Sequence, residues 1–353
     1  MQFGIVLPTR ADSWRIAKQA EAVGVSHAWF YDTALLNAEM FVAMGAAAVR
    51  TERIILATGV LTPSNRIAPV AASGLAALNA LAPGRIAFGV GTGFTARRTL
   101  GLGAMRLAEV EDYVRAVEAL LRGETVDVAI EGAMRRTGLL GPVPPVMNIA
   151  DPIPTHVSAF GPKGRRLVAR LGAGWLGSLG SPDSEAAAIA DMRDAWVEEG
   201  RGPAKLHTTI VGSGAVLDEG ESAGSERARA QAGPLAAVVF HDLVETSGAL
   251  FGEDGSAFPF PDALAAYRKV HAGYPASERH LFNHRGHMMA LRPEETHITG
   301  DIIAAFTLTG TRDALVERLR GMKAVGYDQL AISLPPGQEA DMLERWAGVF
   351  AAL

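Results

Sequence analysis

Two neighbouring segments in the first third of the chain repeat one pattern, in which a short apolar run ends in glycine and threonine and then leads into a helix-forming stretch. The first run, 54–57, ends at Thr58-Gly59-Val60, and the second, 86–90, ends at Gly91-Thr92-Gly93. One such cluster is typical of an ordinary turn. Two in succession favour a ligand site, because consecutive parallel strands deliver their carboxyl ends to the same side of a sheet.

Strand-like and helix-like runs alternate along the whole chain. Parallel strands need crossover helices, and eight such units close a sheet, so the pattern predicts an α/β fold of the (β/α)8 TIM barrel type. An open doubly wound sheet is the alternative, and it is disfavoured because no GxGxxG motif follows the first strand. We expect strands at about 3–7, 27–31, 53–58, 85–90, 154–159, 173–178, 206–213 and 328–333. We expect helices at about 13–23, 38–49, 67–81, 107–122, 163–171, 183–199, 225–248, 312–325 and 338–352.

Two segments exceed what a minimal barrel needs. Residues 124–152 read as a short hairpin followed by a proline-rich connection. Residues 249–310 are too long for a barrel loop and predict an insertion over the carboxyl-terminal face, where long insertions often form lids or substrate walls. We therefore expect a single barrel domain over 1–353 with insertions at about 124–152 and 249–310.

Composition excludes several classes of protein. The formal net charge is -5, which argues against nucleic acid as the main partner because no basic surface remains to neutralise phosphates. The chain has no cysteine, which excludes disulfides, thiolate metal sites and a cysteine nucleophile. We find no run that predicts a secretory signal or a membrane span, so we expect a cytoplasmic protein.

Several separated motifs resemble the luciferase-like flavin-dependent oxidoreductase superfamily, and they occur in the right order. The resemblance covers about 1–215 and resumes at 306–335. It is closest to the branch that includes the coenzyme F420-dependent methylenetetrahydromethanopterin reductases. The motifs are GIVLP, AEAVGVSHAWFYD, ATGVLTPSNRIAPVAASGLAALNALAPGRIAFGVGTG, LAEVEDYVRAVEALLRGE and VSAFGPKGRRLVARLGAGWL.

The resemblance implies a TIM barrel that holds an isoalloxazine or deazaflavin ring at the carboxyl ends of its strands. It places Asp32 beside the ring and implies a non-proline cis peptide at Gly59-Val60. It also makes Ser158 to Gly164 a phosphate-binding turn, which is physically reasonable because helix N-terminal amides and the Lys163 ammonium complement a phosphate. The expected cofactor contacts are Asp32, Thr58, Gly59, Val60, Gly91, Thr92, Gly93, Ser158, Phe160, Gly161, Pro162, Lys163 and Gly164.

One departure bears on the choice of cofactor. The F420-dependent dehydrogenases of this superfamily often have a histidine base directly after the aspartate of the second strand, and this chain has Thr33 there. Reduced flavin with O2 needs no such base. The resemblance therefore favours a two-component monooxygenase that receives reduced FMN from a partner flavin reductase and oxygenates a small organic substrate.

Two other functions remain open. The first is an F420-dependent reductase or dehydrogenase that transfers hydride, in which Arg66, Arg97 or Arg98 would meet the acidic tail of the cofactor. The second is a flavin-binding protein without turnover, which predicts a truncated barrel.

A histidine-rich stretch lies inside the second insertion, at ERHLFNHRGHMMAL. The spacing of His280, His284 and His287 suits one helical face, but Gly286 weakens a helix there and no carboxylate completes a metal-ligand set at helical spacing. We therefore expect no metal, and we expect His284 or His287 to face the cavity above the ring as a catalytic residue beside Asp32. A structural role for these histidines is the alternative, and Asp32 could likewise only cap the turn that follows it.

Small residues on the second expected helix predict a surface for self-association. Ala43, Gly45, Ala46 and Ala47 lie together in it. Members of this superfamily dimerise through barrel helices, so we expect a homodimer.

Overall fold

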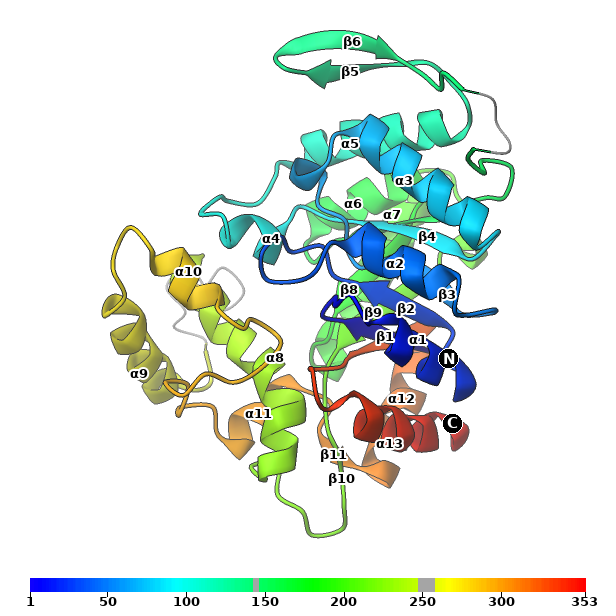
Figure 1. Cartoon of the computed structure of the whole chain (residues 1–353). Coiled ribbons are helices and arrows are strands. Elements are labelled where there is room, and N and C mark those ends of the chain that lie inside the picture. Colours follow the sequence, from blue (N-terminus) through cyan, green and yellow to red (C-terminus); the bar gives the residue numbers. More distant parts are fainter. Residues whose placement is uncertain (142–145, 247–257) are drawn as a thin grey trace.

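The computed structural model describes residues 1–141, 146–246 and 258–353. Eight parallel strands form a closed barrel in the order β1-β12-β9-β8-β7-β4-β3-β2 (Figure 1). The expected (β/α)8 TIM barrel is confirmed. The strands are β1 (Gln2–Leu7), β2 (His27–Phe30), β3 (Ile55–Thr58), β4 (Ile86–Val90), β7 (Thr155–Ser158), β8 (Gly174–Ser178), β9 (Thr208–Gly212) and β12 (Gln329–Ser333).

A layer of helices surrounds the barrel. Each lies within or close to a helix that the periodicity predicts, because each buries one apolar face against the strands. No described helix is long and apolar enough to cross a membrane. The helices of this layer are α1 (Trp14–Ala22), α2 (Met40–Ala48), α3 (Ala68–Leu81), α5 (Leu107–Leu121), α6 (Pro162–Leu171), α7 (Pro182–Glu198), α12 (Arg312–Val325) and α13 (Glu339–Ala351).

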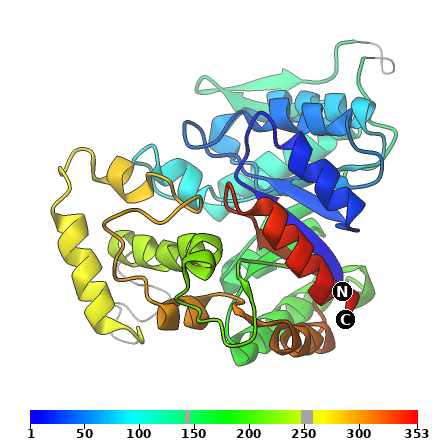
Figure 2. The ribbon, with the colours of Figure 1, turned by 60° about the horizontal axis from the view of Figure 1, so that its bottom comes forward.

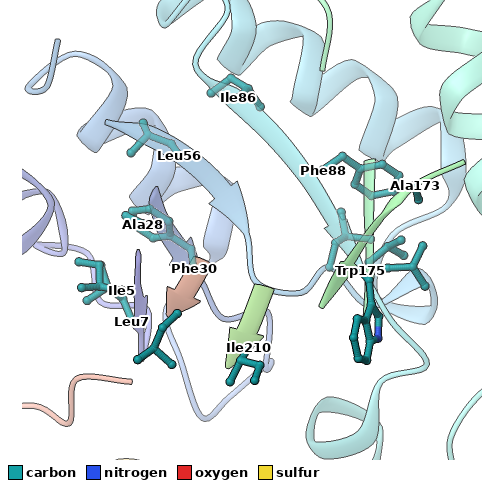
Figure 3. Packing of buried hydrophobic residues seen from close by; sticks show 14 of the residues in the cluster. Ile5, Leu7, Ala28, Phe30, Leu56, Ile86, Phe88, Ala173, Trp175 and Ile210 are labelled. Carbon is teal, nitrogen blue, oxygen red and sulfur yellow. The ribbon is translucent and has the colours of Figure 1, made fainter. Parts of the chain in front are cut away.

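Side chains alternate between the two faces of each barrel strand. In β1 and β2, Ile5 and Phe30 belong to the large apolar cluster between strands and helices, as Figure 3 shows. Val6 and Trp29 belong to a separate small cluster. Because successive side chains of a strand point to opposite faces, this second cluster is the interior of the barrel.

One large side chain fills the barrel interior. Trp29 is 1% exposed and packs with a cluster of small and medium apolar residues. Its Nε1 donates a hydrogen bond to Oε1 of Gln329 over 3.0 Å. The other members of the cluster are Val6, Ala57, Ala87, Leu176 and Ala331.

The large insertion begins earlier than the expected residue 249. The short parallel strands β10 (Val216–Leu217) and β11 (Gly310–Thr311) pair with each other at its two ends. Helix α8 (Glu226–Glu245), which we expected in the barrel wall, packs instead on the insertion helices. The reason is its apolar face, where Phe240 is fully buried in a second hydrophobic cluster.

The other helices of the insertion are α9 (Pro261–Ala272), α10 (Arg279–His284) and α11 (Gly300–Phe306). Figures 1 and 2 both show these helices and α8 gathered at one side of the barrel, next to α4 (Phe94–Arg98). The expected hairpin is present as β5 (Val126–Ile130) and β6 (Ala133–Thr137), which pair antiparallel. Part of the proline-rich connection after it, residues 142–145, and part of the second expected insertion, residues 247–257, lie outside the described residues.

Three histidines gather at the amino ends of the strands, around the base of Trp29. The ring of His27 lies 5.8 Å from the Trp29 ring, and the rings of His156 and His207 lie 5.4 Å apart. Burial, helped by the neighbouring histidines, lowers the pKa of His27 to about 4 and that of His156 to about 3. Burial also lowers the pKa of His207. The folded protein therefore holds these imidazoles neutral.

This cluster predicts acid sensitivity. Between pH 6.5 and about 4 the unfolded chain binds protons on His27 and His156 that the folded chain excludes. The free energy of unfolding should therefore fall as the pH falls, by up to about 1.4 kcal/mol per pH unit for each histidine. Urea denaturation at several pH values measures the slope. His156→Leu should flatten it and the half-exposed His280→Leu should not, and an unchanged slope in His156→Leu would contradict the assignment.

Candidate active site at the carboxyl ends of the strands

The carboxyl ends of β3, β4 and β7 come together at Gly91. A Cβ added at Gly91 would lie 2.9 Å from Cγ2 of Val60 and 3.3 Å from Cβ of Ser158, so only glycine fits between these residues. The Gly59-Val60 peptide is cis, as the resemblance implies. The hydroxyl of Thr58 donates to the carbonyl of Gly89 over 2.6 Å and ties β3 to β4. The structure thus brings together most of the residues expected around the ring.

The Gly91-Thr92-Gly93 segment leads directly into α4. Gly93 has φ +78 and precedes the first residue of that helix, a conformation that favours glycine. A Cβ at Gly93 would lie 2.5 Å from Cγ2 of Thr62. The loops after β3 and β4 are therefore packed against each other, and α4 starts at the edge of the site.

Asp32 is buried and fully engaged. Its carboxylate accepts hydrogen bonds from Nη1 of Arg66 over 2.7 Å and from the backbone N–H of Thr62 over 3.0 Å. Its carbonyl accepts from the side-chain amide of Asn65 over 3.0 Å. Arg66 also pairs with Glu39. Asp32 therefore holds the loop after β3 in place, rather than the turn that directly follows it in the chain, which is the alternative named above.

The segment Ser158 to Gly164 forms an exposed turn between β7 and α6. Phe160 is 53% exposed, and Lys163 is exposed and has no ion pair with the described residues. Arg165 fixes the turn from behind, because its Nη1 donates to the carbonyl of Phe160 over 2.7 Å while the same side chain pairs with Asp191. The turn presents a free ammonium and a helix N-terminus to the outside.

His284 and His287 do not face an open cavity, contrary to the expectation. They are 2% and 3% exposed, and their Nδ1 atoms lie 3.3 Å apart. Nε2 of His284 lies 2.9 Å from Oε1 of Glu245. Nε2 of His287 lies 3.2 Å from the hydroxyl of Thr95, the second residue of α4. Burial together with the other two histidines of this cluster, His241 and His284, holds the pKa of His287 well below its ordinary value.

A second branch of the same cluster runs through α8. Nδ1 of His241 lies 3.0 Å from Nδ1 of His287, and Nε2 of His241 lies 2.6 Å from Oε1 of Glu295. Nη2 of Arg292 contacts the same oxygen of Glu295. Burial alone would raise the pKa of Glu295, but hydrogen bonds from His241 and Arg292 outweigh it and lower this pKa to about 2.

Ion pairs fasten this histidine cluster to α4. Nη1 of Arg98 lies 3.0 Å from Oδ1 of Asp242, and Nε of Arg98 lies 3.5 Å from Oε2 of Glu245. The guanidinium also stacks on Phe94, 3.8 Å from the ring centre. The insertion is thereby attached to the end of β4, and Arg98 and Arg66 are not free for a cofactor tail. Arg97 has only the carbonyl of Gly103 as a partner among the described side-chain contacts.

Sequence reasoning missed the partners of the histidines. The sequence pattern gives only one sign that His241, Glu245 and Glu295 belong to the site. The sign is that His241 and Glu245 are four residues apart and share a face of the predicted helix. His280 does not join the cluster, because its ring lies beside Gly101, where an added Cβ would be 3.6 Å from its Cε1. His287 lies beyond the end of α10 at His284, and Gly286, with φ +67, turns the chain before it. In the described part of the chain no group of three or more histidine, aspartate or glutamate side chains could hold a metal ion.

The buried Asp32–Arg66 pair gives a stability prediction. Arg66→Gln leaves the Asp32 carboxylate buried without its cation, so the free energy of unfolding should fall by about 3 kcal/mol. Adding Asp32→Asn should recover part of the loss. Arg122→Gln is the control, because Arg122 pairs with Glu124 on the surface and its loss should cost less than about 1 kcal/mol. If denaturant titrations give Arg66→Gln and Arg122→Gln the same loss in free energy of unfolding, the buried Asp32–Arg66 pair does not stabilise the fold more than a surface pair does.

Solved structures share this barrel over nearly the whole chain. The coenzyme F420-dependent tetrahydromethanopterin reductase of Methanopyrus kandleri superposes with a TM-score of 0.73 at 20% identity, covering 98% of this chain and 97% of that protein. An F420-dependent secondary alcohol dehydrogenase in complex with an F420-acetone adduct superposes with a TM-score of 0.71 at 17% identity, covering 99% and 98%. At these identities the likeness establishes the fold.

Curated relatives correct the expected function. An F420-dependent glucose-6-phosphate dehydrogenase of Beutenbergia cavernae is 28% identical over 315 residues, which is 86% of this chain and 79% of the relative. A 5,10-methylenetetrahydromethanopterin reductase of Methanolobus tindarius is 24% identical over 325 residues, which is 91% and 89%. The expected monooxygenase using reduced FMN and O2 is therefore wrong, and the expected partner flavin reductase loses its basis.

The family itself is established by a model of luciferase-like monooxygenases, which matches residues 1–329. This range includes the other seven barrel strands and the whole insertion, and it ends at the first residue of β12. Since the match covers most of the sequence, the chain is an oxidoreductase that belongs to the luciferase-like monooxygenase family.

Proposed function

We propose that this chain is a coenzyme F420-dependent oxidoreductase that transfers hydride between the deazaflavin and a small organic substrate. The observation that carries the proposal is that a relative aligned over 86% of this chain is named as an F420-dependent dehydrogenase. The hydride acceptor or donor is the cofactor, and the protein supplies orientation, electrostatics and a dry site.

The residues at the barrel mouth suit such a group. Gly91 leaves space beside Val60 and Ser158 that any larger side chain would fill, and a flat ring needs such close backbone approach. We assign these three residues to the ring. The exposed Lys163 and the N-terminus of α6 would hold the phosphate, and Arg97 would face the acidic tail.

Thr33, the residue after Asp32, does not supply the base that oxidation of an alcohol needs. Oxidation of an alcohol by hydride loss also requires a group that accepts the hydroxyl proton. Thr33 is buried and is not a base at neutral pH, so the proton must pass to another residue at the mouth.

Binding measurements test the cofactor assignment. Titrations of the protein with F420 and with FMN, each followed by fluorescence, should give the lower Kd for F420. Lys163→Ala should raise the F420 Kd by about 5-fold to 150-fold, which corresponds to about 1–3 kcal/mol for a lost hydrogen bond to a charged group. Lys205→Ala is the control, because Lys205 precedes β9 at the opposite end of the barrel. Tighter binding of FMN, or an unchanged Kd in Lys163→Ala, would count against the proposal.

We also infer a homodimer through the outer faces of α2 and α3. The exposed positions there include Val42, Val49, Val70 and Leu81, which are 51–65% exposed. Neither helix contains a charged residue. Contiguous apolar helix surface of this kind favours association. The small residues expected at the dimer surface lie on two faces of α2. Ala43 and Ala47, one helical turn apart, are fully buried against the barrel, whereas Gly45 and Ala46 are half-buried.

A charge placed on this surface should prevent association. Val42→Glu combined with Val70→Glu should halve the mass measured by light scattering after gel filtration, because two uncompensated carboxylates would be desolvated in the interface. Val197→Glu, at an equally exposed valine of α7, should leave the mass unchanged. If the wild-type protein is already monomeric at micromolar concentration, the proposed homodimer is wrong.

A further inference from the structure

We propose that Thr95, His287, His284 and Glu245 form a proton relay that accepts the hydroxyl proton of the substrate at the end of β4. The proposal rests on the F420-dependent oxidation inferred above. The contacts are continuous: Thr95 to His287 is 3.2 Å, His287 to His284 is 3.3 Å, and His284 to Glu245 is 2.9 Å. Thr95 is half-buried at the start of α4, so its hydroxyl is the end of the chain that a substrate can reach.

The hydrogen-bond partners determine where each neutral imidazole carries its proton. The Glu245 carboxylate accepts, so His284 must donate through Nε2, and its Nδ1 carries no proton. The same argument applies to His241, whose Nε2 donates to Glu295. His287 faces both bare Nδ1 atoms with its own Nδ1, which must therefore carry the proton.

It follows that Nε2 of His287 is an unprotonated acceptor aimed at the hydroxyl of Thr95. This is the orientation that a base requires. The contact between Nη2 of Arg292 and Nε2 of His241 does not alter the result, because that nitrogen of Arg292 donates to Glu295 and to the hydroxyl of Tyr267.

The charges around the histidines leave room for one proton. Three buried or half-buried carboxylates face two guanidiniums, so the cluster carries one net negative charge when the histidines are neutral. A proton transferred to the histidines brings this sum to zero, so the cluster can accept it without burying a net positive charge. The groups counted are Asp242, Glu245, Glu295, Arg98 and Arg292.

The position of the guanidiniums selects the branch that receives the proton. Arg292 already compensates Glu295, and Arg98 lies closer to Asp242 than to Glu245. Glu245 is thus the least compensated carboxylate, and an imidazolium at His284 would lie directly against it.

Other charged groups near the cluster do not change this balance. Glu294 lies 3.9 Å from Arg292, but it also pairs with Arg285 at the surface, 3.5 Å apart, so this second pair adds no net charge. The pKa of His271, on α9, is lowered mainly by burial, so this side chain stays neutral. Tyr267 is neutral as well, because burial raises its pKa well above the ordinary range.

The relay takes up one proton for each hydride that leaves the substrate. The carbon–hydrogen bond of the substrate alcohol breaks, and F420, when bound at the barrel mouth, would take up the hydrogen with its electron pair as hydride. The hydroxyl proton passes to Oγ1 of Thr95 as the proton of that hydroxyl passes to Nε2 of His287. The Nδ1 proton of His287 moves to Nδ1 of His284, and the substrate becomes a carbonyl compound. Reduction runs the same steps in reverse.

The protonation pattern is tested on the free protein by NMR of ¹⁵N-labelled histidine, assigned by single replacements. We expect the Nδ1–H form of His287 and the Nε2–H forms of His241 and His284 at neutral pH. A His287 that carries its proton on Nε2 would overturn the relay, because it would then donate to Thr95 rather than accept.

Kinetics test the role of Thr95. With F420 and with glucose 6-phosphate or 2-propanol as probe alcohols, Thr95→Val should lower kcat by about 100-fold, the usual scale of general base catalysis, with KM and the F420 Kd within about twofold. Thr99→Val is the matched control on the same segment, since its hydroxyl donates to the carbonyl of Ala96 and, within the part of the chain that the structure describes, to no histidine. Wild-type kcat in Thr95→Val would overturn the relay.

Replacing two nearby carboxylates in turn tests the charge balance of the cluster. Glu245→Gln keeps the shape of the side chain but removes the charge that stabilises the transferred proton, so it should lower kcat and shift the pH at which activity is half-maximal. Glu294→Gln, a nearby carboxylate without contact to the histidines, should do neither. Equal pH profiles in both variants would overturn the relay. If the wild-type protein binds no F420 or oxidises neither probe, the proposed F420-dependent oxidation of alcohols is wrong. The protonation pattern of the histidines, measured by NMR, then decides by itself whether the relay exists.

Discussion

The indole of Trp29 is the constraint on which the barrel depends. It occupies the interior of eight strands, and its neighbours there are mainly alanines, because larger side chains would not leave room for it. Its Nε1 is satisfied by Gln329, so the buried ring carries no unpaired donor. A Cβ at Gly59 would lie 2.6 Å from Cβ of Trp29, and one at Gly89 would lie 3.1 Å from its ring. Gly59 of the candidate site and Gly89 of β4 therefore let the backbones of β3 and β4 close over the indole. The floor of the candidate site and the core of the barrel are therefore packed by the same residues.

The insertion depends on a different kind of interaction, the pairing of buried charges. Removing carboxylates and guanidiniums from water is costly, and the cost is met only when each group finds a partner of good geometry. Glu295 with Arg292 and Asp242 with Arg98 meet this condition, and Arg98 belongs to the barrel while Asp242 belongs to the insertion. The ion pairs therefore do more than stabilise the insertion. They hold its histidines against α4 and so against the end of β4.

Thr33 excludes a base at one position only. The absence of a histidine after Asp32 means that no base stands directly after the second strand, and it does not indicate which cofactor is bound. A barrel presents several loops at its mouth, so a base can come from a different strand end or from an insertion. The buried histidine cluster reaches the site through Thr95, on the loop of the fourth strand rather than the second. Thr33 alone therefore does not indicate a monooxygenase, because the base of a barrel enzyme need not follow the second strand.

The sequence alone determined the features that depend on near neighbours in the chain. Alternation within strands and periodicity within helices produced the barrel and its wall, and the motif resemblance located the Gly59-Val60 peptide, which is cis. The tertiary structure decided which distant residues meet. His241 and Glu295 are separated by 54 residues, and His284 and Glu245 by 39. Helix α8 carries a pattern that suits a barrel wall equally well, and only the second apolar cluster assigns it to the insertion. The physical reason is that local periodicity indicates which face of an element is buried, whereas the partner that buries it, or that neutralises a charge, is chosen by packing across the whole chain.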